Sequence, residues 1–476
     1  MTRIFKLGSA VVLLTSLTSC MLVGPNYERP ALALPESYGQ AGQGIESSIL
    51  DEIPDQWWKL YEDPELNALV EKAFNNNSNI QNAVARIEEA DAQMREAGAS
   101  LLPTIDLGGN GTRSRLTESG PFPPFGENPR NNFNLSLNSA IELDFWGKLR
   151  RAKEAARANY LATTYAKEMV VLTTSGLVVS SYLNIRSLDS QLKNLEENLK
   201  ISEESLALAK RRHEGGIASI LDVQQASLVR DNLLSQEQEL MRTRKLAEHV
   251  LNILTLEEVK LEQADLASLP MPPTPPLGLP SAILENRPDV REAEQMMIAA
   301  NANIGQAKAA LYPSISLTGT FGGESVELGD VLKSASRIWS YGLSLNLPIF
   351  NGGALSARVD QASARQKQAL QSYIGTVSTA FKEVNDALVN LRQYKAIETI
   401  QASKKETTQA MLDVAQNRYK AGYSSYLDVL EAQRSHIEAS QSYVISRQNT
   451  LTATVDLFKA LGGGWQNANS KEDNKS

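Results

Sequence analysis

The chain has 476 residues, of which 42% are hydrophobic and 21% charged, and this composition excludes a chain that is disordered throughout. A formal net charge of −8 argues against a nucleic-acid partner, which needs a basic face. With one cysteine, no intramolecular disulfide can form. No proline occurs between Pro129 and Pro270 or after Pro348. Because an interior proline kinks or breaks a helix, these two tracts favour very long helices.

The first 20 residues resemble an export signal. A short positive region precedes an apolar stretch, residues 7–17, which is shorter than the roughly 20 residues that a transmembrane helix needs. It ends at Leu17-Thr18-Ser19-Cys20, which resembles a bacterial lipobox, so residues 1–19 are predicted to be removed and Cys20 to carry covalent lipid. An ordinary signal peptide with a chance cysteine is the alternative. Met21 stands where an Asp usually means retention in the inner membrane, so the outer membrane is the predicted destination.

The rest of the chain contains one pattern twice. Residues 100–105 are echoed by residues 310–315, and residues 212–223 by residues 418–429, at offsets of 210 and 206 residues. This period is far longer than that of a solenoid. Each half is predicted to contain a helix, a strand, a loop, a strand, a very long helix, a glycine turn and a helix.

Four segments alternate between apolar and polar side chains, as strands with two different faces do. The clearest are residues 133–145 and 339–349, and their hairpin partners begin near Ile105 and Ile315. At roughly 9–11 residues they match tilted membrane-spanning strands, although a half-buried soluble sheet would alternate in the same way. Four strands cannot close a barrel, and open strand edges cannot face lipid. Membrane strands would therefore require several protomers to share one barrel.

The first very long helix is predicted from Lys148 to near Arg212, which is roughly 95 Å at 1.5 Å per residue. Apolar residues keep heptad spacing in this helix and in its counterpart in the second half, so both are predicted to form coiled coils. Glycines end both helices. Beyond the signal, no other apolar run is long enough to predict a transmembrane helix. Shorter helices are predicted over about 64–100, 220–255, 280–311 and 425–461.

Several short motifs together resemble one family. They are the Cys20 lipobox, Trp57-Trp58 with Asp63-Pro64-Glu65-Leu66, the two Leu-Pro and Tyr-Pro strand entries, and residues 422–434, Gly-Tyr-Ser-Ser-Tyr-Leu-Asp-Val-Leu-Glu-Ala-Gln-Arg. The combination resembles the TolC-like outer-membrane factors, and more narrowly their lipoprotein branch typified by OprM and NodT. The resemblance covers nearly the whole mature chain. It implies an α+β membrane protein in which the duplicated repeat gives four transmembrane β-strands and long coiled-coil helices, and three copies form a twelve-stranded β-barrel with an α-helical periplasmic tunnel.

The repeats and the resemblance together predict how the chain is divided. An equatorial domain around the tunnel is expected to take up the N-terminal segment, the proline-rich connection between the repeats and the C-terminal tail. The predicted parts are a signal peptide 1–19, a lipidated and equatorial segment 20–63, a first repeat 64–256, the connection 257–280, a second repeat 281–462 and a tail 463–476.

The resemblance also implies a function and partners. The chain is expected to form a homotrimeric duct through which small toxic compounds leave the cell across the outer membrane. The expected protein partners are a periplasmic adaptor and an inner-membrane pump, commonly of the resistance-nodulation-division class. Outer-membrane lipids are the remaining expected partner. Within the channel class a protein-secretion duct is the alternative, and the sequence does not reveal the exported substrate. A coiled-coil scaffold or adhesin would explain the helices and the lipid, but neither the four strands nor the duplication.

No pattern typical of an enzyme is present. The three histidines, His213, His249 and His436, lie in no metal-ligand spacing. The sequence contains no P-loop, dinucleotide fingerprint or nucleophile elbow. No catalytic residue, no metal and no cofactor is therefore predicted apart from the covalent lipid on Cys20, and energy for transport must come from a partner.

The candidate functional residues lie at the two glycine turns. Asp428 and Glu431 are three residues apart and share one face of a helix. By the resemblance they match the acidic ring at the family's periplasmic aperture. The turns themselves are the candidate docking sites for the adaptor or pump, and they contain Gly215, Gly216 and Gly422.

A gate network is also implied by the resemblance. Asp222 matches a gate residue, and Tyr419 matches a residue that helps to tie neighbouring coiled coils. Ser424 stands where some members have an arginine, which puts that salt link in doubt, and Arg418 is the candidate replacement. For Asp428 and Asp222 the alternative is helix capping, because carboxylates are favoured at helix N-termini.

Overall fold

The computed structural model describes residues 22–32, 54–120, 126–274 and 286–463. The chain divides into two compact units, and each takes segments from both halves of the sequence. The first unit comprises residues 1–31, 86–164 and 292–373, and the second comprises residues 32–85, 165–291 and 374–476.

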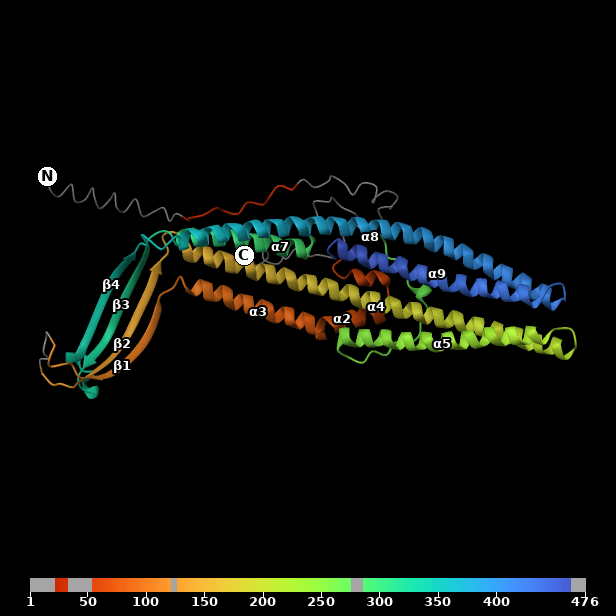
Figure 1. The fold of residues 1–476 in the computed structure, drawn as a ribbon, viewed down its shortest axis with the longest axis horizontal. Helices are drawn as coiled ribbons and strands as arrows, with labels where there is room; N and C mark the ends of the chain where they lie inside the picture. Colours follow the sequence, from red (N-terminus) through yellow and green to blue (C-terminus); the bar gives the residue numbers. More distant parts are fainter. Residues whose placement is uncertain (1–21, 33–53, 121–125, 275–285, 464–476) are drawn as a thin grey trace. The chain divides into compact units, whose positions relative to one another are not determined.

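The first unit contains one four-stranded antiparallel sheet (Figure 1). Its strands are paired in the order β1-β2-β3-β4. β2 and β3 are 14 and 12 residues long, somewhat longer than the alternation predicted. The strand bounds are β1 Thr104–Ser114, β2 Arg130–Leu143, β3 Ser314–Ser325 and β4 Arg337–Asn346.

The register places apolar and polar side chains in separate rows across the sheet. Leu137 lies opposite Phe321, which lies opposite Trp339. In the neighbouring row, Asn138 lies opposite Thr320, and the Thr320 hydroxyl lies 3.0 Å from Asn138 Oδ1. Adjacent rows point to opposite faces of a sheet, so the predicted alternation is confirmed as one apolar and one polar face.

A charge should be costly on the apolar face and tolerated on the polar one. Leu345 lies in the apolar set opposite Ile315, and Asn346 is the next residue of β4. An arginine on a barrel exterior costs roughly 2–4 kcal/mol at mid-bilayer and about 0–1 kcal/mol near the interfaces, and Leu345, one residue before the end of β4, is nearer the second case. We expect Leu345→Arg to reduce the yield of assembled protein in outer-membrane fractions, and Asn346→Arg to assemble normally while changing conductance. Equal yields would mean that the two faces do not separate lipid from lumen.

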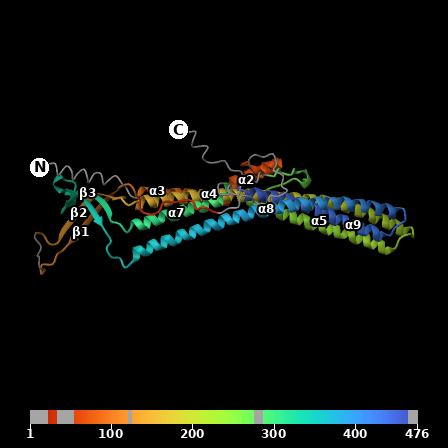
Figure 2. The ribbon, with the colours of Figure 1, turned by 90° about the horizontal axis from the view of Figure 1, so that it is seen from above.

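The two longest helices are α4, Lys148–Glu214, and α8, Ala354–Lys420, of 67 residues each. Each reverses at a glycine turn into a shorter helix that runs back beside it, α5, Ile220–Thr255, after α4 and α9, Tyr426–Ala460, after α8 (Figures 1 and 2). One stretch of α4 is long and apolar enough to cross a membrane, but half of it is buried inside the protein, as in a core helix. Eight of the ten heptad residues that the sequence predicted as seam positions are buried, whereas Leu199 and Phe381 are half-buried. The eight are Leu188, Leu192, Leu195, Leu206, Val377, Val384, Leu388 and Leu391.

The predicted helix over 64–100 is wrong in one respect, because it is two helices with a break at Asn77. The Asn77 side chain accepts hydrogen bonds from the backbone N–H groups of Asn79 and Ile80 at the start of the second helix, which is how an asparagine caps a helix N-terminus. Its amide also donates to the carbonyl of Leu254 at 2.9 Å. The remaining helices are α2 Pro64–Asn76, α3 Ser78–Ala99 and α7 Pro288–Ala309, with short 3-10 turns η3 Trp57–Tyr61, η4 Leu266–Ser268, η6 Leu328–Asp330 and η7 Ser334–Ser336.

The core of the second unit is built around η3. Trp57 stacks on Phe458 of α9, with ring centroids 5.3 Å apart. The Tyr61 hydroxyl lies 2.6 Å from the Thr454 hydroxyl, and Trp57, Tyr61 and Phe458 are almost completely buried. The tryptophan pair that carried part of the family resemblance therefore anchors this core.

A buried ion-pair network lies beside that core. The side chain of Asp189 on α4 is 1% exposed and pairs with Arg186 on the same helix and with Arg244 on α5. Arg244 also pairs with Glu248, and Arg186 with Glu65 of α2. The network therefore links α2, α4 and α5 within the second unit.

Candidate functional site

Both glycine turns have the same hydrogen-bonded geometry. At the first, Ile217 N–H donates to the Arg212 carbonyl at 2.8 Å and Gly216 N–H donates to that of His213 at 2.9 Å. At the second, the corresponding bonds run from Tyr423 to Arg418 and from Gly422 to Tyr419. This is the Schellman arrangement, in which the residue after the helix needs a positive φ. Gly216 and Gly422 supply it, with φ of 72° and 84°.

The helices that leave the turns begin with side-chain caps. The Ser219 hydroxyl accepts from the N–H of Leu221 before α5, and Asp222 lies in the first turn of that helix. Before α9, Ser425 and Asp428 form a capping box, in which the Ser425 N–H donates to Asp428 Oδ2 at 3.1 Å. Asp428 therefore does cap a helix, which leaves one of its carboxylate oxygens outside this bond.

The two turns are connected by Arg212 at the end of α4. Its guanidinium carbon lies 4.5 Å from the centroid of the Tyr419 ring, a cation–π distance. Its Nη1 donates to the backbone carbonyl of Tyr419. Charged donors make stronger hydrogen bonds than neutral ones, so this one side chain holds the end of α4 to the end of α8.

An apolar cluster surrounds this contact. Tyr419 and Tyr426 meet edge to face with ring centroids 5.6 Å apart, and both are buried together with Leu206, Ala226 and Val429. Burial raises the pKa of the Tyr426 hydroxyl to about 12. The pKa of Tyr419 is also raised by burial, with the Arg212 cation acting against it and the charge of Asp222 adding to it. The charge of Asp222 therefore acts on Tyr419, and the gate role of Asp222 and the tying role of Tyr419 stay predictions.

The remaining candidates lie along a groove between α8 and α9. Arg418, Ser424, Asp428 and Glu431 line one end of it, and Asp428, Glu431 and Arg418 are exposed. Small and apolar residues, among them Met411 and Val414, also line the groove. The structure therefore gathers two acidic groups and one arginine on an accessible surface, and their role in an aperture stays a prediction.

One residue of this site was missed by the sequence reasoning. Arg418, the proposed substitute for the missing arginine link, lies in the exposed groove, whereas Arg212 makes the contact between the hairpins. Arg212 and Arg418 occupy equivalent positions in the two repeats. That equivalence was the available signal, but only the packing distinguishes the two residues.

The predicted lipid anchor, Cys20, lies outside the described residues. Shortly after it the chain is tightly held, since the Val23 N–H donates to the Trp146 carbonyl at 3.1 Å. A Cβ on Gly147 would lie 2.6 Å from Leu22 Cδ2. Trp146 stacks on Tyr312 at 4.9 Å and its indole N–H donates to the Pro313 carbonyl. These aromatic residues follow β2 and precede β3, at the end of the strands where an interface belt is expected.

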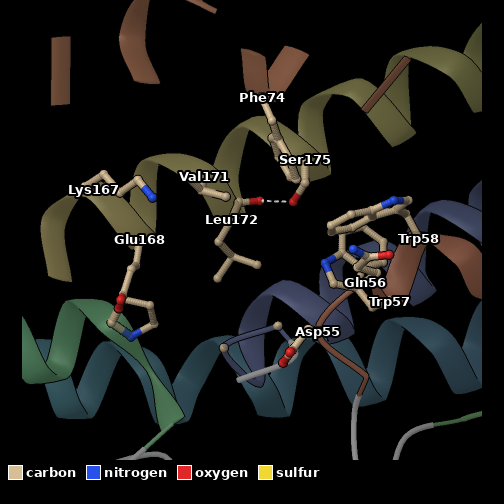
Figure 3. Close-up of a pocket in the computed structure, with 13 residues that line it drawn as sticks. Asp55, Gln56, Trp57, Trp58, Phe74, Lys167, Glu168, Val171, Leu172 and Ser175 are labelled. Carbon is tan, nitrogen blue, oxygen red and sulfur yellow. Dashed lines mark hydrogen bonds between the residues drawn. The ribbon is translucent and has the colours of Figure 1, made fainter. Parts of the chain in front are cut away.

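A pocket in the second unit lies beside η3 (Figure 3). Trp57, Trp58 and Leu172 line one part of it and Glu168 another. Glu168 Oε2 is buried without a hydrogen-bond partner, and burial raises the pKa of this carboxyl to about 7, with Lys167 and Arg291 acting against the shift. The carboxyl is therefore held in a site that favours its neutral form.

Glu168→Gln should stabilise the protein at high pH only. A raised carboxyl pKa means that stability is fully present below the unfolded value and is lost as pH rises towards about 7. A neutral amide avoids this loss, so we expect a gain of about 1 kcal/mol above pH 7, after discounting for solvent, and no gain below pH 4. Thermal unfolding of both proteins across pH 4–8 measures it. A gain that does not depend on pH would show that ionisation of Glu168 is not the cause.

In the part of the chain that the structure describes, no group of three or more His, Cys, Asp or Glu residues could hold a metal ion. The groove, the turns and the Arg212 contact contain no nucleophile–base pair among their named residues. What they offer is charge and packing, and a role of these residues in closure stays a prediction.

Comparison with known proteins places this geometry in a family. The model of the outer membrane efflux protein family matches residues 69–255 and 279–463. The chain is 34% identical over 461 residues to the solvent efflux pump outer membrane protein SrpC of Pseudomonas putida, covering 95% of this chain and 97% of SrpC. It is 33% identical, with the same coverage, to the cation efflux system protein CusC of Escherichia coli O6:H1.

A solved structure shows the same fold. The outer membrane channel CmeC of Campylobacter jejuni superposes with a TM-score of 0.87 at 27% identity, covering 95% of this chain and 98% of CmeC. The predicted fold class is confirmed: an α+β membrane channel protein with a duplicated repeat, four membrane strands in each chain and long coiled-coil helices. The family consists of efflux channels rather than enzymes. The chain belongs to the outer membrane efflux protein family and serves as an exit channel of the outer membrane.

Proposed function

We propose that three copies of this chain form one exit duct, which receives small toxic compounds from an inner-membrane pump of the resistance-nodulation-division class through a periplasmic adaptor. The observation that carries the proposal is the sheet. It has an apolar and a polar face, and the chain offers β1 and β4 as its two edges. Unpaired edges are not tolerated in lipid, and three such sheets joined edge to edge supply twelve strands and close a barrel.

The cargo is proposed only as a chemical class. Two relatives at nearly equal identity carry different names, one for solvent efflux and one for cation efflux. Both relatives align with nearly the whole of this chain, so the same duct architecture occurs in proteins that are named for quite different cargoes. We infer that selection lies in the pump, and that this chain passes whatever small compound the pump delivers.

The acidic pair is proposed to narrow the periplasmic end. Three copies of Asp428 and Glu431 around one axis would repel one another and favour a bound cation, and rings of carboxylates make pores cation-selective. The structure dictates the choice of variant, because Asp428 also caps α9. Asp428→Asn/Glu431→Gln removes the charges and keeps a side-chain oxygen for the cap.

Bilayer recordings test this arrangement. We expect the native channel to conduct weakly, to prefer cations and to be blocked by multivalent cations from the periplasmic side. Asp428→Asn/Glu431→Gln should lose the block and remain trimeric. Glu438→Gln is the matched control, since it removes an exposed charge from the same helix outside this groove. Unchanged block in the double variant would show that the constriction lies elsewhere and that Asp428 only caps a helix.

A covalent lipid on Cys20 is proposed as an additional anchor. Cys20 precedes Val23 by three residues, no more than about 11 Å of extended chain, and Val23 is bonded to Trp146 beside the strand ends. A lipid there could reach the membrane surface next to the barrel. Because the strands supply their own membrane affinity, Cys20→Ala behind a cleavable signal should still give trimers in the outer-membrane fraction. A soluble monomer would contradict the proposed barrel.

A further inference from the structure

The helix segments around the two turns contain an unusual share of unmatched polar groups. We call these segments, residues 197–237 and 401–441, the tip coil. Among the described residues, eight of the twelve buried side-chain nitrogen and oxygen atoms without a hydrogen-bond partner lie in it. Buried polar groups are normally paired, and an unpaired one lowers stability. They belong to Asn198, Arg212, Gln401, Tyr419, Ser424, Gln433 and His436, with two atoms in Gln433.

The most concentrated of these defects is on α9. Tyr426, Val429, Gln433, His436 and Ser440 follow one another at spacings of three and four residues, and all are buried. This is the spacing of a coiled-coil seam, where apolar side chains are expected. Three successive seam positions of α9 are thus polar.

Two of the three are poorly satisfied. Gln433 is completely buried, and neither its Oε1 nor its Nε2 has a partner. His436 is 6% exposed; its Nε2 lies 3.3 Å from the Ser440 hydroxyl, and its Nδ1 has no partner. Polar seam residues give up stability, so the packing of α9 is weakened at this layer.

Charges on two neighbouring helices act on the imidazole. Lys405 and Asp413 approach from α8 and Glu197 from α4. Burial lowers the pKa of His436, the Lys405 ammonium lowers it further, and the two carboxylates act against the shift. Two of these groups have contacts of their own: Gln409 donates to Asp413 at 3.0 Å, and the Lys405 ammonium lies 5.3 Å from the Tyr443 ring centroid.

We propose that Gln433, His436 and Ser440 form a proton-sensitive layer in the seam of α9, and that proton uptake by His436 loosens α9 from α8 and α4. The neutral imidazole makes one hydrogen-bond contact in the buried seam, whereas an imidazolium carries a full charge and two N–H donors, and its Nδ1 has no partner in this packing. The closed packing is therefore fully stable above the ordinary histidine pKa of about 6.5 and loses stability as pH falls below it. The periplasmic setting rests on the proposed function, and in that setting an acidic medium would favour a looser tip coil.

Hydrogen exchange of the full-length protein in detergent at pH 7.5 and pH 5.5 tests the proposal. After correction for the chemical exchange rate, we expect peptides covering residues 430–441 to exchange faster at the lower pH, by up to about tenfold, because pH 5.5 lies one unit below the ordinary histidine pKa of about 6.5. In His436→Leu this acceleration should vanish. The other two histidines are exposed, so His249→Gln and His213→Gln are matched controls that should keep it.

A second measurement does not depend on a variant that folds. With only three histidines in the chain, selective isotope labelling allows the His436 imidazole to be titrated by NMR, and its pKa should lie below the ordinary histidine value of about 6.5. An ordinary or raised pKa for His436, or acceleration that persists in His436→Leu, overturns the proposal. Conductance measured over the same pH range distinguishes a failure of this proposal from a failure of the proposed function. Faster exchange with constant conductance supports the proton-sensitive layer and contradicts a gate at the hairpin turns.

Discussion

Asp189→Asn is expected to lower the free energy of unfolding of the second unit by about 3 kcal/mol, the scale of breaking a buried ion pair by removing one partner. The Asp189 carboxylate is 1% exposed and pairs with Arg186 and Arg244 from two helices. It also accepts from the backbone N–H of Ala264 at 3.3 Å. Asparagine preserves the shape but leaves two guanidinium groups without their shared anion.

The measurement is thermal unfolding followed by circular dichroism, together with the temperature at which trimers dissociate on gels. The control is Lys193→Ala. Lys193 lies on α4, the same helix as Asp189, and forms an ion pair with Asp265 that is largely exposed. Exposed pairs contribute little, so that variant should unfold like the native protein. Equal unfolding temperatures for Asp189→Asn and Lys193→Ala would mean that the buried network does not hold α4 and α5 together.

The architecture was readable from the sequence because its signals are local and repeated. Alternation along residues 133–145 identified β2, and the heptads identified the seams of α4 and α8, which the structure buries. The break at Asn77 was missed although a local signal was present: residues 75–79 are four asparagines and a serine, which favour helix caps and turns. Its capping bonds and its contact with Leu254 exist only once α2 and α5 pack.

The candidate site was only partly predictable, for a physical reason. Asp428, Glu431 and the turn glycines could be named from spacing and resemblance, since they are close in sequence. The contact between Arg212 and Tyr419 joins residues that are 207 positions apart. The unmatched polar seam around His436 was also invisible, because a lone histidine in a helix is usually solvated, and only burial shows that this one is not.

Arg212→Ala is expected to open the channel in the absence of any partner. It removes a cation–π contact and a charged hydrogen bond to the Tyr419 carbonyl, together worth about 2 kcal/mol, or a roughly 30-fold shift in the ratio of closed to open channels. Single-channel recordings should show a larger mean conductance and longer open times. Arg418→Ala should have a much smaller effect, because Arg418 is exposed in the groove rather than packed between the hairpins.

Tyr419→Phe distinguishes the ring from its hydroxyl. The Tyr419 hydroxyl is buried without a hydrogen-bond partner, so its removal relieves an unpaired polar group and leaves the ring and the backbone carbonyl in place. We therefore expect Tyr419→Phe to stay closed and Tyr419→Leu, which lacks the aromatic face, to open towards the level of Arg212→Ala. A channel that opens in Tyr419→Phe as widely as in Arg212→Ala would show that the hydroxyl holds the hairpins together, and the cation–π account of closure would then be wrong.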